Sequence, residues 1–382
     1  MVLAIEQGPI RPPSEAHSLL LRVTRNCSWN RCEFCHIYKG QRFSPRTVEE
    51  VKGDIDAVKQ IVSEITAASW NRGLGGKVTP ELARSVLSLP HRYPDGYRSV
   101  LLWLYTGGKN VFLQDANNLI LRTQNLVEIL IYLKKTFPSV ERITTYSRAK
   151  TVAFKKVEEL RELHDAGLSR IHIGLESGYD PLLEFMQKGV TARDHIEAGR
   201  KVKESGISLS EYIMPGLGGK TMWKQHAVET AKVLNQINPD FIRIRTLKAL
   251  RIMPLYRKIE SGELVLLSDD EIVAEERLLI ENLEGITSHF TSDHILNLLE
   301  ELDGKFPEAK SRMLAVIDRY LALPDSERAN FRLGRRAGYY RSLEDLANPD
   351  LRIRVDQIMN RIETEHPGSL DEVITDLMES FI

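Results

Sequence analysis

Six short apolar runs, each about as long as a β-strand, recur between residues 19 and 247. The segments between them carry apolar residues three or four positions apart, which is typical of helices with one buried face. Strands that alternate with helices in this way form consecutive βαβ units around a parallel sheet. Six units fall short of the eight of a closed barrel, so the pattern predicts an α/β fold, a partial (β/α)6 TIM-like barrel. The predicted strands are Leu19–Val23, Asn110–Leu113, Arg142–Tyr146, Arg170–Leu175, Ser208–Met214 and Phe241–Leu247.

Beyond about residue 250 the strand pattern stops and helical patterns follow. We therefore predict a barrel domain over residues 1–250, with an insertion near residues 69–100, and a helical C-terminal domain over residues 251–382. Gly167 and Gly206 each end a predicted helix, because glycine adopts the left-handed backbone of a helix C-terminus at little cost. The predicted helices are Thr47–Ala68, Asn125–Thr136, Val152–Ala166, Ala192–Glu204, Trp223–Asn235, Asp269–Glu284, Ile295–Leu302, Pro307–Ala322, Leu343–Glu363 and Leu370–Ser380.

The three cysteines of the chain lie in the loop after the first predicted strand, in the pattern C-x4-C-x2-C. Three thiols this close together are not a disulfide framework, and clustered thiols point to a metal or redox site. An electron-transfer [4Fe–4S] cluster takes four cysteines, so Cys27, Cys32 and Cys35 would leave one iron open for chemistry. Two alternatives stay open: a zinc site completed by His36, and three thiols that bind nothing.

A strand that runs into such a cysteine loop resembles the radical S-adenosylmethionine (SAM) superfamily, where the usual spacing is C-x3-C-x2-C. Phe34, just before the last cysteine, matches an aromatic position that in this family packs near the SAM adenine. The segment Gly174-Leu175-Glu176-Ser177-Gly178 resembles one branch, which includes anaerobic coproporphyrinogen oxidase, the elongator catalytic subunit and the methylthiotransferases. The resemblance implies a [4Fe–4S] cluster on the three cysteines, with SAM on its open iron.

The same resemblance assigns cofactor contacts to the ends of the predicted strands, where parallel α/β folds place ligands. Asp115 would accept from the SAM amino group, unless it is a helix N-cap. Arg148 would pair with the SAM carboxylate, unless it forms a surface ion pair. Glu176 would reach the ribose or the amino group, unless it forms a structural ion pair. The predicted cofactor-binding residues are Phe34, Asp115, Tyr146, Ser147, Arg148, Glu176, Ser177, Gly216 and Gly218.

Substrate contacts are predicted after the fifth and sixth helical patterns. Arg243 and Arg245 alternate with isoleucines on the sixth predicted strand, so they share one face. On the inner face they would bind an acidic substrate group, and on the outer face they would form salt bridges. Further along, Asp293 is predicted to cap a helix that carries His294 and Asn297 one turn apart, either as a polar cluster at the barrel mouth or as an ordinary capped helix.

Charge and hydropathy narrow the classes of function. The 52 basic and 53 acidic residues give a net charge of −1, without the basic excess of a dedicated nucleic-acid binder. The short cluster Arg332, Arg335 and Arg336 is either a solvated helix face or a modest RNA contact. No basic leader with an apolar core opens the chain, and no apolar run approaches the ~20 residues of a membrane helix. We therefore expect a cytoplasmic protein with no membrane partner.

The resemblance implies a radical SAM enzyme, an oxidoreductase or transferase of anaerobic metabolism. It would cleave SAM reductively at one cluster and abstract hydrogen from an unidentified small-molecule substrate, with electrons from a reductant such as flavodoxin or ferredoxin. Because no further cysteine exists, a second cysteine-ligated cluster is not expected. The alternatives are radical SAM modification of RNA or protein, and a non-enzymatic zinc or iron–sulfur binding protein.

Overall fold

The computed structural model describes residues 5–87 and 95–379 of the chain. The chain forms two compact units, each drawn from separated stretches. The predicted division into domains at residue 250 is not tested by these units and stays a prediction. Unit 1 consists of Met1–Asn30, Ile37–Ile173 and Glu197–Leu209, and unit 2 of Arg31–His36, Gly174–Ile196 and Ser210–Ile382.

Unit 1 is built on parallel strands that match the first four predicted ones. Leu21 of the first strand lies beside Leu113 of the second, and both side chains are fully buried. Near-continuous burial is typical of parallel strands. In sheet order these strands are β1 (Leu19–Arg22), β4 (Asn110–Gln114), β5 (Arg142–Ser147) and β6 (Leu168–Glu176), and the end of β6 belongs to unit 2.

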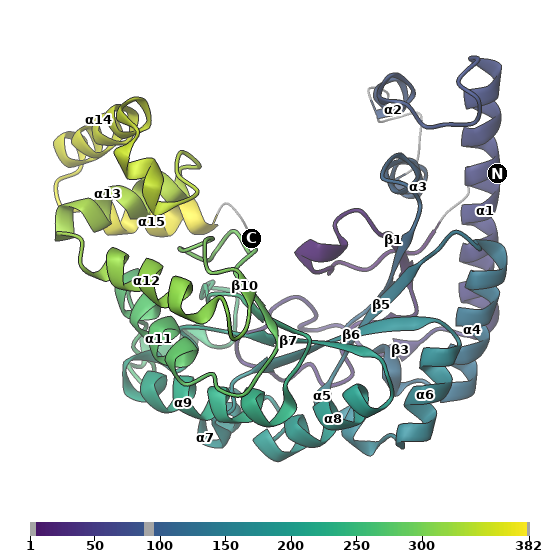
Figure 1. Ribbon diagram of the computed structural model, residues 1–382, viewed down its shortest axis with the longest axis horizontal. Coiled ribbons are helices and arrows are strands. Elements are labelled where there is room, and N and C mark those ends of the chain that lie inside the picture. Colours follow the sequence, from purple (N-terminus) through teal and green to yellow (C-terminus); the bar gives the residue numbers. More distant parts are fainter. Residues whose placement is uncertain (1–4, 88–94, 380–382) are drawn as a thin grey trace. The chain divides into compact units, whose positions relative to one another are not determined.

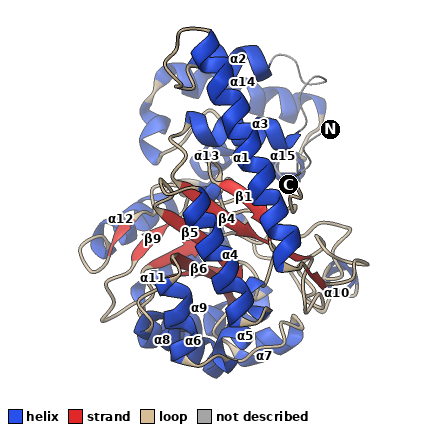
Figure 2. Cartoon of the chain, turned by 90° about the vertical axis from the view of Figure 1, so that its right-hand side faces the viewer, coloured by secondary structure: helices blue, strands red, loops and turns tan. Residues whose placement is uncertain are grey.

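Helices α1 (Val48–Asn71), α4 (Thr123–Thr136) and α6 (Val157–Asp165) of unit 1 lie side by side (Figure 1). Figure 2 shows α1 and α4 in front of β1, β4 and β5. α1 begins at a capping box, in which the side chains of Thr47 and Glu50 accept from each other's backbone N–H groups. The predicted insertion holds α2 (Pro80–Leu87) and α3 (Asp95–Tyr105), and α3 packs against α1 and β1.

Two details of unit 1 bear on the predicted helices. The predicted helix Val152–Ala166 is two helices, α5 (Ala149–Phe154) and α6, because Lys155 and Lys156 between them have extended backbone. Gly167 follows α6 with a φ of 112°, and Gly206 follows α8 (Ala192–Glu204) with a φ of 87°. These positive angles confirm the left-handed helix ends that the glycines predict.

Unit 2 contains strands beyond the last predicted one. β7 (Ser208–Ile213, in unit 2 from Ser210), β8 (Phe241–Ile244) and β9 (His289–Thr291) are parallel, and β10 (Gly304–Lys305) pairs with β9 in the antiparallel direction. The strand order β1-β4-β5-β6-β7-β8-β9-β10 confirms a mostly parallel α/β fold that contains all six predicted strands. The expectation that strands stop near residue 250 is wrong, because β9 and β10 lie beyond it. These two strands are too short to show an alternating pattern in the sequence.

The predicted helix Ile295–Leu302 is absent from the structure as well. Asn297 in this segment donates to the carbonyl of Ile244 at 2.9 Å and accepts from the backbone N–H of Thr246 at 2.9 Å. The buried guanidinium of Arg336 donates to the carbonyl of Leu296 at 2.9 Å. The backbone is held by these long-range bonds instead of by helical ones, so Asp293 caps no helix.

The helices of unit 2 include a row in which α9 (Gly219–Ile237) packs on α11 (Asp269–Glu281) and α11 packs on α12 (Lys310–Leu321), as Figure 1 shows. α13 (Asp325–Arg336) packs on α14 (Pro349–Glu365) and α15 (Leu370–Glu379). Shorter helices are α7 (Asp180–Phe185) and α10 (Tyr256–Glu260).

The basic cluster of α13 is not a solvated face. Arg332 pairs with Asp371 at 3.1 Å, Arg335 with Glu300 at 3.1 Å, and Arg336 with Asp269 at 3.2 Å. The Arg336 side chain is 1% exposed. These arginines therefore join α13 to its neighbours in unit 2. Among the helices that the structure describes, none has the length and apolar content to cross a bilayer.

Candidate functional site

The cysteine loop begins in unit 1 and continues in unit 2. Cys27 belongs to unit 1, whereas Cys32 and Cys35 belong to unit 2. None of the three forms a disulfide, and each is of intermediate burial. Asn26 and Asn30, on either side of Cys27, have φ angles of 68° and 50°, and asparagine is among the few residues that take this left-handed backbone readily. The backbone N–H of Asn30 points at the Cys27 sulfur at 3.4 Å.

One buried amide fixes the unit 1 part of this loop. The Asn117 side chain donates to Ser28 Oγ at 2.9 Å and to Thr151 Oγ1 at 2.8 Å. Its carbonyl oxygen accepts from Ser147 Oγ and from the Arg148 backbone N–H, both at 3.0 Å. All the hydrogen-bonding positions of the amide are used, so Asn117 joins the residue after Cys27 to the end of β5.

The predicted residues at the end of β5 therefore lie beside the cysteine loop. The Arg148 guanidinium lies 4.9 Å from the centre of the Trp29 ring, within the range of a cation–π contact. Tyr146 packs edge-on against Phe112, with ring centres 5.2 Å apart, and against His172 at 5.8 Å. Contact of these residues with SAM stays a prediction.

Asp115 is fully buried in unit 1 and is not a helix N-cap, because the short helix η2 (Asn118–Ile120) begins after Asn117. Its Oδ2 accepts from Arg22 at 2.7 Å and from the Asn26 backbone N–H at 3.1 Å. Its Oδ1 accepts from the hydroxyl of Tyr38. Burial, reinforced by the Asp115 charge, raises the pKa of Tyr38. Asp115 thus binds Asn26 before the cysteines and Tyr38 after them. Its contact with SAM stays a prediction.

Phe34 closes an apolar cluster in unit 2. It is 9% exposed and packs with Leu182, Met186 and Leu217. The backbone of the preceding residue is tied on both sides: the Glu33 N–H donates to the Met186 carbonyl at 3.0 Å, and the Glu33 carbonyl accepts from Leu255 N–H at 2.9 Å. The segment that carries Cys32 and Cys35 is therefore packed against the loops after β6 and β8.

Glu176 at the end of β6 has a left-handed backbone, with a φ of 61°. Its carboxylate pairs with Lys188 at 3.0 Å, and the Lys188 ammonium lies 5.4 Å from the centre of the Phe34 ring. A Cβ at Gly174 would lie 2.2 Å from the Glu176 carboxylate oxygen, so a larger residue there would displace the end of the Glu176 side chain. The structure thus brings together three features that the sequence singled out: Phe34, Glu176 and the Gly174 segment.

The next residues let helix α9 approach the strand end. Ser177 is fully buried and accepts from the backbone N–H of Tyr179 at 3.0 Å. A Cβ on Gly178 would lie 2.5 Å from the Glu229 carbonyl oxygen, and the Gly178 N–H donates to Thr230 Oγ1 at 2.8 Å. The second glycine of the segment therefore serves close packing of backbone on backbone.

The loop after β7 carries the predicted glycines. Gly216 has a φ of 88°, and its N–H donates to the Glu275 carboxylate at 2.6 Å. Gly218 lies at the N-terminus of α9, where a Cβ would come within 3.0 Å of the backbone of Met222 and Trp223. Both positions need glycine for local reasons, and their contact with the adenine stays a prediction.

The predicted substrate residues separate into two sets. Arg243 is buried and forms an ion pair with Asp293. The side chain of Asn297 hydrogen-bonds to the backbone at the end of β8. Arg245 is exposed. Burial, with the Arg245 charge as a second cause, lowers the pKa of His294 to about 4, and the same two causes lower the pKa of His36. Arg245, His36 and His294 therefore share one electrostatic environment in unit 2.

A family model settles what kind of protein carries these features. The model described as the radical SAM superfamily matches residues 21–231, which is more than half of the chain and includes all three cysteines. The chain belongs to the radical SAM superfamily. Its cofactors are accordingly a [4Fe–4S] cluster and SAM, and it is a radical SAM enzyme.

Curated relatives are similar over parts of this radical SAM chain. A tRNA uridine(34) acetyltransferase of Methanocaldococcus jannaschii is 28% identical over 28% of the chain and 20% of its own length. The threonylcarbamoyladenosine tRNA methylthiotransferase MtaB of Bacillus subtilis is 23% identical over 66% of the chain and 53% of its own length. The chain thus spans from about a fifth to about half of these relatives.

Two solved structures match parts of the chain. Coproporphyrinogen III oxidase (HemN) from Escherichia coli matches with a TM-score of 0.45 and 16% identity, over 70% of this chain and 52% of that one. The archaeal Elp3 of Methanocaldococcus infernus, solved with an N-terminal deletion, matches with a TM-score of 0.42 and 14% identity, over 62% of this chain and 58% of that one.

The donor set of the radical SAM chain fits an iron–sulfur cluster. Thiolates are the ligands of such clusters, and the three cysteines form no disulfide and are partly accessible. The described residues show no ready-made group of three His, Cys, Asp or Glu side chains at a metal-binding distance, so the fit rests on the chemistry of the three thiols. Cys27, Cys32 and Cys35 are the residues that would hold the cluster.

Several residues of the site were missed by sequence reasoning. Asn117, Tyr38, His226 and Glu275 all connect predicted site segments. His226 and Glu275 each stand as a polar residue on a largely buried helix face. A polar residue on an apolar helix face can be seen in the sequence, but the sequence does not show that these two side chains contact each other.

Proposed function

We propose that this radical SAM enzyme cleaves SAM reductively at one [4Fe–4S] cluster on Cys27, Cys32 and Cys35, and that it abstracts hydrogen from a small-molecule substrate. The observation that carries the proposal is the set of three thiols, with no fourth in the chain, inside the part that matches the family. Three ligands leave one iron of a cubane cluster without a protein ligand, and that iron is where SAM would bind.

The chain's own residues would hold and orient the reactants. When bound, the cluster would supply the electron for reductive cleavage of SAM, which makes hydrogen abstraction from the substrate possible. Phe34 offers an apolar surface for the adenine, and Glu176, steadied by Lys188 at 3.0 Å, offers a carboxylate to the ribose or the amino group. Arg148 would pair with the SAM carboxylate, and the buried packing around Phe34 excludes water from the radical.

A small substrate fits the charge of the molecule. The net charge is −1, and the basic cluster on α13 is paired with carboxylates. Arg245 is the exposed cation that we assign to an acidic group of the substrate. The proposal includes a cytoplasmic, anaerobic setting with flavodoxin or ferredoxin as reductant, because reductive cleavage needs a low-potential electron donor.

The decisive experiment is anaerobic reconstitution with iron and sulfide, followed by dithionite and SAM. We expect about four irons per chain, as in a cubane cluster, and formation of 5′-deoxyadenosine. Cys32→Ala should lose both, whereas the control Ser63→Ala, at an exposed position on α1, should keep both. Bound zinc, or a cluster that leaves SAM intact, would contradict the proposal and favour a zinc or electron-transfer protein.

The second candidate is modification of RNA. It is favoured by the names of the curated relatives, both of which act on tRNA. Binding of tRNA should be measured between 50 and 200 mM salt, roughly the range over which phosphate contacts weaken by orders of magnitude. Tight, salt-sensitive binding would favour the RNA substrate, and weak binding at low salt would favour the small molecule.

A further inference from the structure

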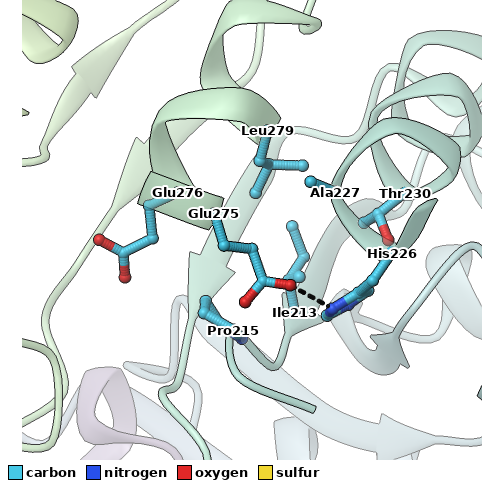
Figure 3. Close-up of a pocket in the computed structure, with 8 residues that line it drawn as sticks. All are labelled: Ile213, Pro215, His226, Ala227, Thr230, Glu275, Glu276 and Leu279. Carbon is cyan, nitrogen blue, oxygen red and sulfur yellow. Dashed lines mark hydrogen bonds and ion pairs between the residues drawn. The ribbon is translucent and has the colours of Figure 1, made fainter. Parts of the chain in front are cut away.

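Two neighbouring polar side chains in unit 2 bridge the loops after β6 and β7. His226 on α9 places its Nε2 3.0 Å from the carbonyl oxygen of Glu176, and its Nδ1 2.8 Å from Glu275 Oε1 on α11. The other Glu275 oxygen accepts from the Gly216 N–H at 2.6 Å. Figure 3 shows His226 and Glu275 pointing at each other, with Glu276 turned away. One pair of side chains therefore links Glu176 to Gly216.

The bridge lies among apolar side chains. His226 and Glu275 are 1% and 2% exposed, and the pocket that they line also includes Ile213, Ala227 and Leu279. Burying a carboxylate and an imidazole costs free energy, and well-packed apolar residues are often as stabilising as a buried ion pair. The packing of α9 on α11 therefore does not explain why a histidine and a glutamate occupy these positions. Their hydrogen bonds to the two loops do explain it.

The two loop groups fix which outer atom of the bridge donates and which accepts. The Glu176 carbonyl only accepts, so His226 Nε2 must carry a hydrogen. The Gly216 N–H only donates, so Glu275 Oε2 must accept. His226 therefore donates to the loop after β6, and Glu275 accepts from the loop after β7.

The bridge holds Glu176, whose backbone conformation is unfavourable. A non-glycine residue with a φ of 61°, as at Glu176, is strained unless its surroundings fix it. The Glu176 carbonyl accepts from Met214 N–H at 3.1 Å as well as from His226. Because the peptide after Glu176 is fixed in this way, the Glu176 carboxylate points to Lys188.

We propose that His226 and Glu275 are positioning residues for the SAM site, which hold Glu176 and Gly216 in the relative geometry that SAM binding requires. The inference rests on the proposed function, in which these two segments contact SAM. It assigns to α9 and α11 a contribution to cofactor affinity, although neither His226 nor Glu275 touches the cofactor.

The test compares SAM affinity and local exchange in reconstituted holoenzyme. The variants are His226→Leu, which loses both hydrogen bonds, Glu275→Leu, which loses the acceptor for the Gly216 N–H and the partner of His226 Nδ1, and His226→Gln, whose amide can still donate to the Glu176 carbonyl. The matched control is Glu276→Gln, because Glu276 lines the same pocket and is as buried, but no hydrogen bond of Glu276 reaches either loop in the described residues. Equilibrium dialysis gives the Kd for SAM, and hydrogen exchange reports on residues 174–180 and 214–219.

We expect His226→Leu and Glu275→Leu to raise the Kd for SAM about tenfold or more, the equivalent of leaving one buried polar group without its partner. Iron content should be unchanged and exchange in both loops faster. His226→Gln should recover part of the affinity, and Glu276→Gln should match the wild type. A Kd for both variants within twofold of the wild type overturns the positioning role, whether or not exchange changes. Where His226→Leu does not fold, Glu275→Leu decides by the same criterion.

The wild type tests the proposed function, and the comparison of the variants with the wild type tests this inference. A wild type that holds its cluster and leaves SAM unbound refutes both. A wild type that binds SAM, beside variants of equal affinity, refutes the positioning role alone.

Discussion

Gly178 shows how much a single missing methyl group can matter at a strand end. The Glu229 carbonyl oxygen and the Thr230 Cα would lie 2.5 and 2.7 Å from a Cβ at this position. Both are backbone atoms of α9, so relief would require the helix to shift. Gly174 differs, because the atom that a Cβ would meet there is the end of the Glu176 side chain.

We expect Gly178→Ala to lower the free energy of unfolding by roughly 1–3 kcal/mol, the usual cost of overpacking. The shift of α9 should also disturb the Glu176 carbonyl bond to His226. Thermal unfolding of the variant and the wild type measures the effect. An unchanged midpoint would mean that α9 moves away from β6 at no cost.

Glu276 is a second residue whose surroundings dictate its behaviour. Burial, reinforced by the nearby charges of Glu275 and Asp269, raises the pKa of Glu276 to about 8. The folded protein therefore keeps a proton on this carboxyl between its ordinary pKa near 4.5 and pH 8, where the unfolded chain has released it. Stability from this group is complete below pH 4.5 and is lost as the pH rises to 8.

The expected slope is a loss of about 1.4 kcal/mol for each pH unit within this range. Glu276→Gln, which is neutral at every pH, should remove that contribution. Thermal midpoints at pH 6 and pH 8 for both proteins test this. If the two proteins lose the same stability between these pH values, then Glu276 is ionised in the folded state already at pH 6.

At the scale of elements, α1 illustrates a helix whose ends are well specified and whose interior is not optimal. Its capping box at Thr47 and Glu50 satisfies the first N–H groups, and its buried face is formed by Val51, Ile55 and Val58. Gly53 lies on its exposed side, where a Cβ would meet nothing within 4 Å.

Gly53→Ala should therefore raise the free energy of unfolding by roughly 0.5–1 kcal/mol, because alanine loses less backbone freedom on folding than glycine. A higher midpoint in chemical denaturation, with an unchanged slope, would confirm it. A lower midpoint would show that the open space beside Gly53 is used by another part of the chain.

The elements also show where sequence reasoning succeeds. β1, β4 and β5 were predicted to within a residue or so, because buried parallel strands appear as apolar runs. β9 has only Phe290 as a fully buried apolar residue, and β10 has two residues, so neither leaves a pattern to find. The segment that contains Asn297 has helical composition but makes its hydrogen bonds to β8, which no local pattern can reveal.

At the scale of the whole molecule, the candidate site can be predicted from the sequence only where its residues are consecutive. The cysteines and the Gly174–Gly178 segment stand out because their spacing alone carries information, and their contact with the cofactors stays a prediction. His226 and Glu275 lie 49 positions apart, and Asn117 and Ser28 lie 89 positions apart. Such pairs depend on the fold bringing separate helices and loops together, so only the structure shows them.

Asn117 also determines what would be needed to transplant the cysteine loop into another scaffold. Its amide donates to Ser28 and Thr151 and accepts from Ser147 and Arg148, so the loop is not a self-contained insert. An aspartate of the same shape would keep the acceptors and lose both donors. A designer who copies residues 26–30 would have to copy an asparagine after the second strand and the end of the third with them. The portable part of this site is therefore a set of three separate chain segments and not a linear motif.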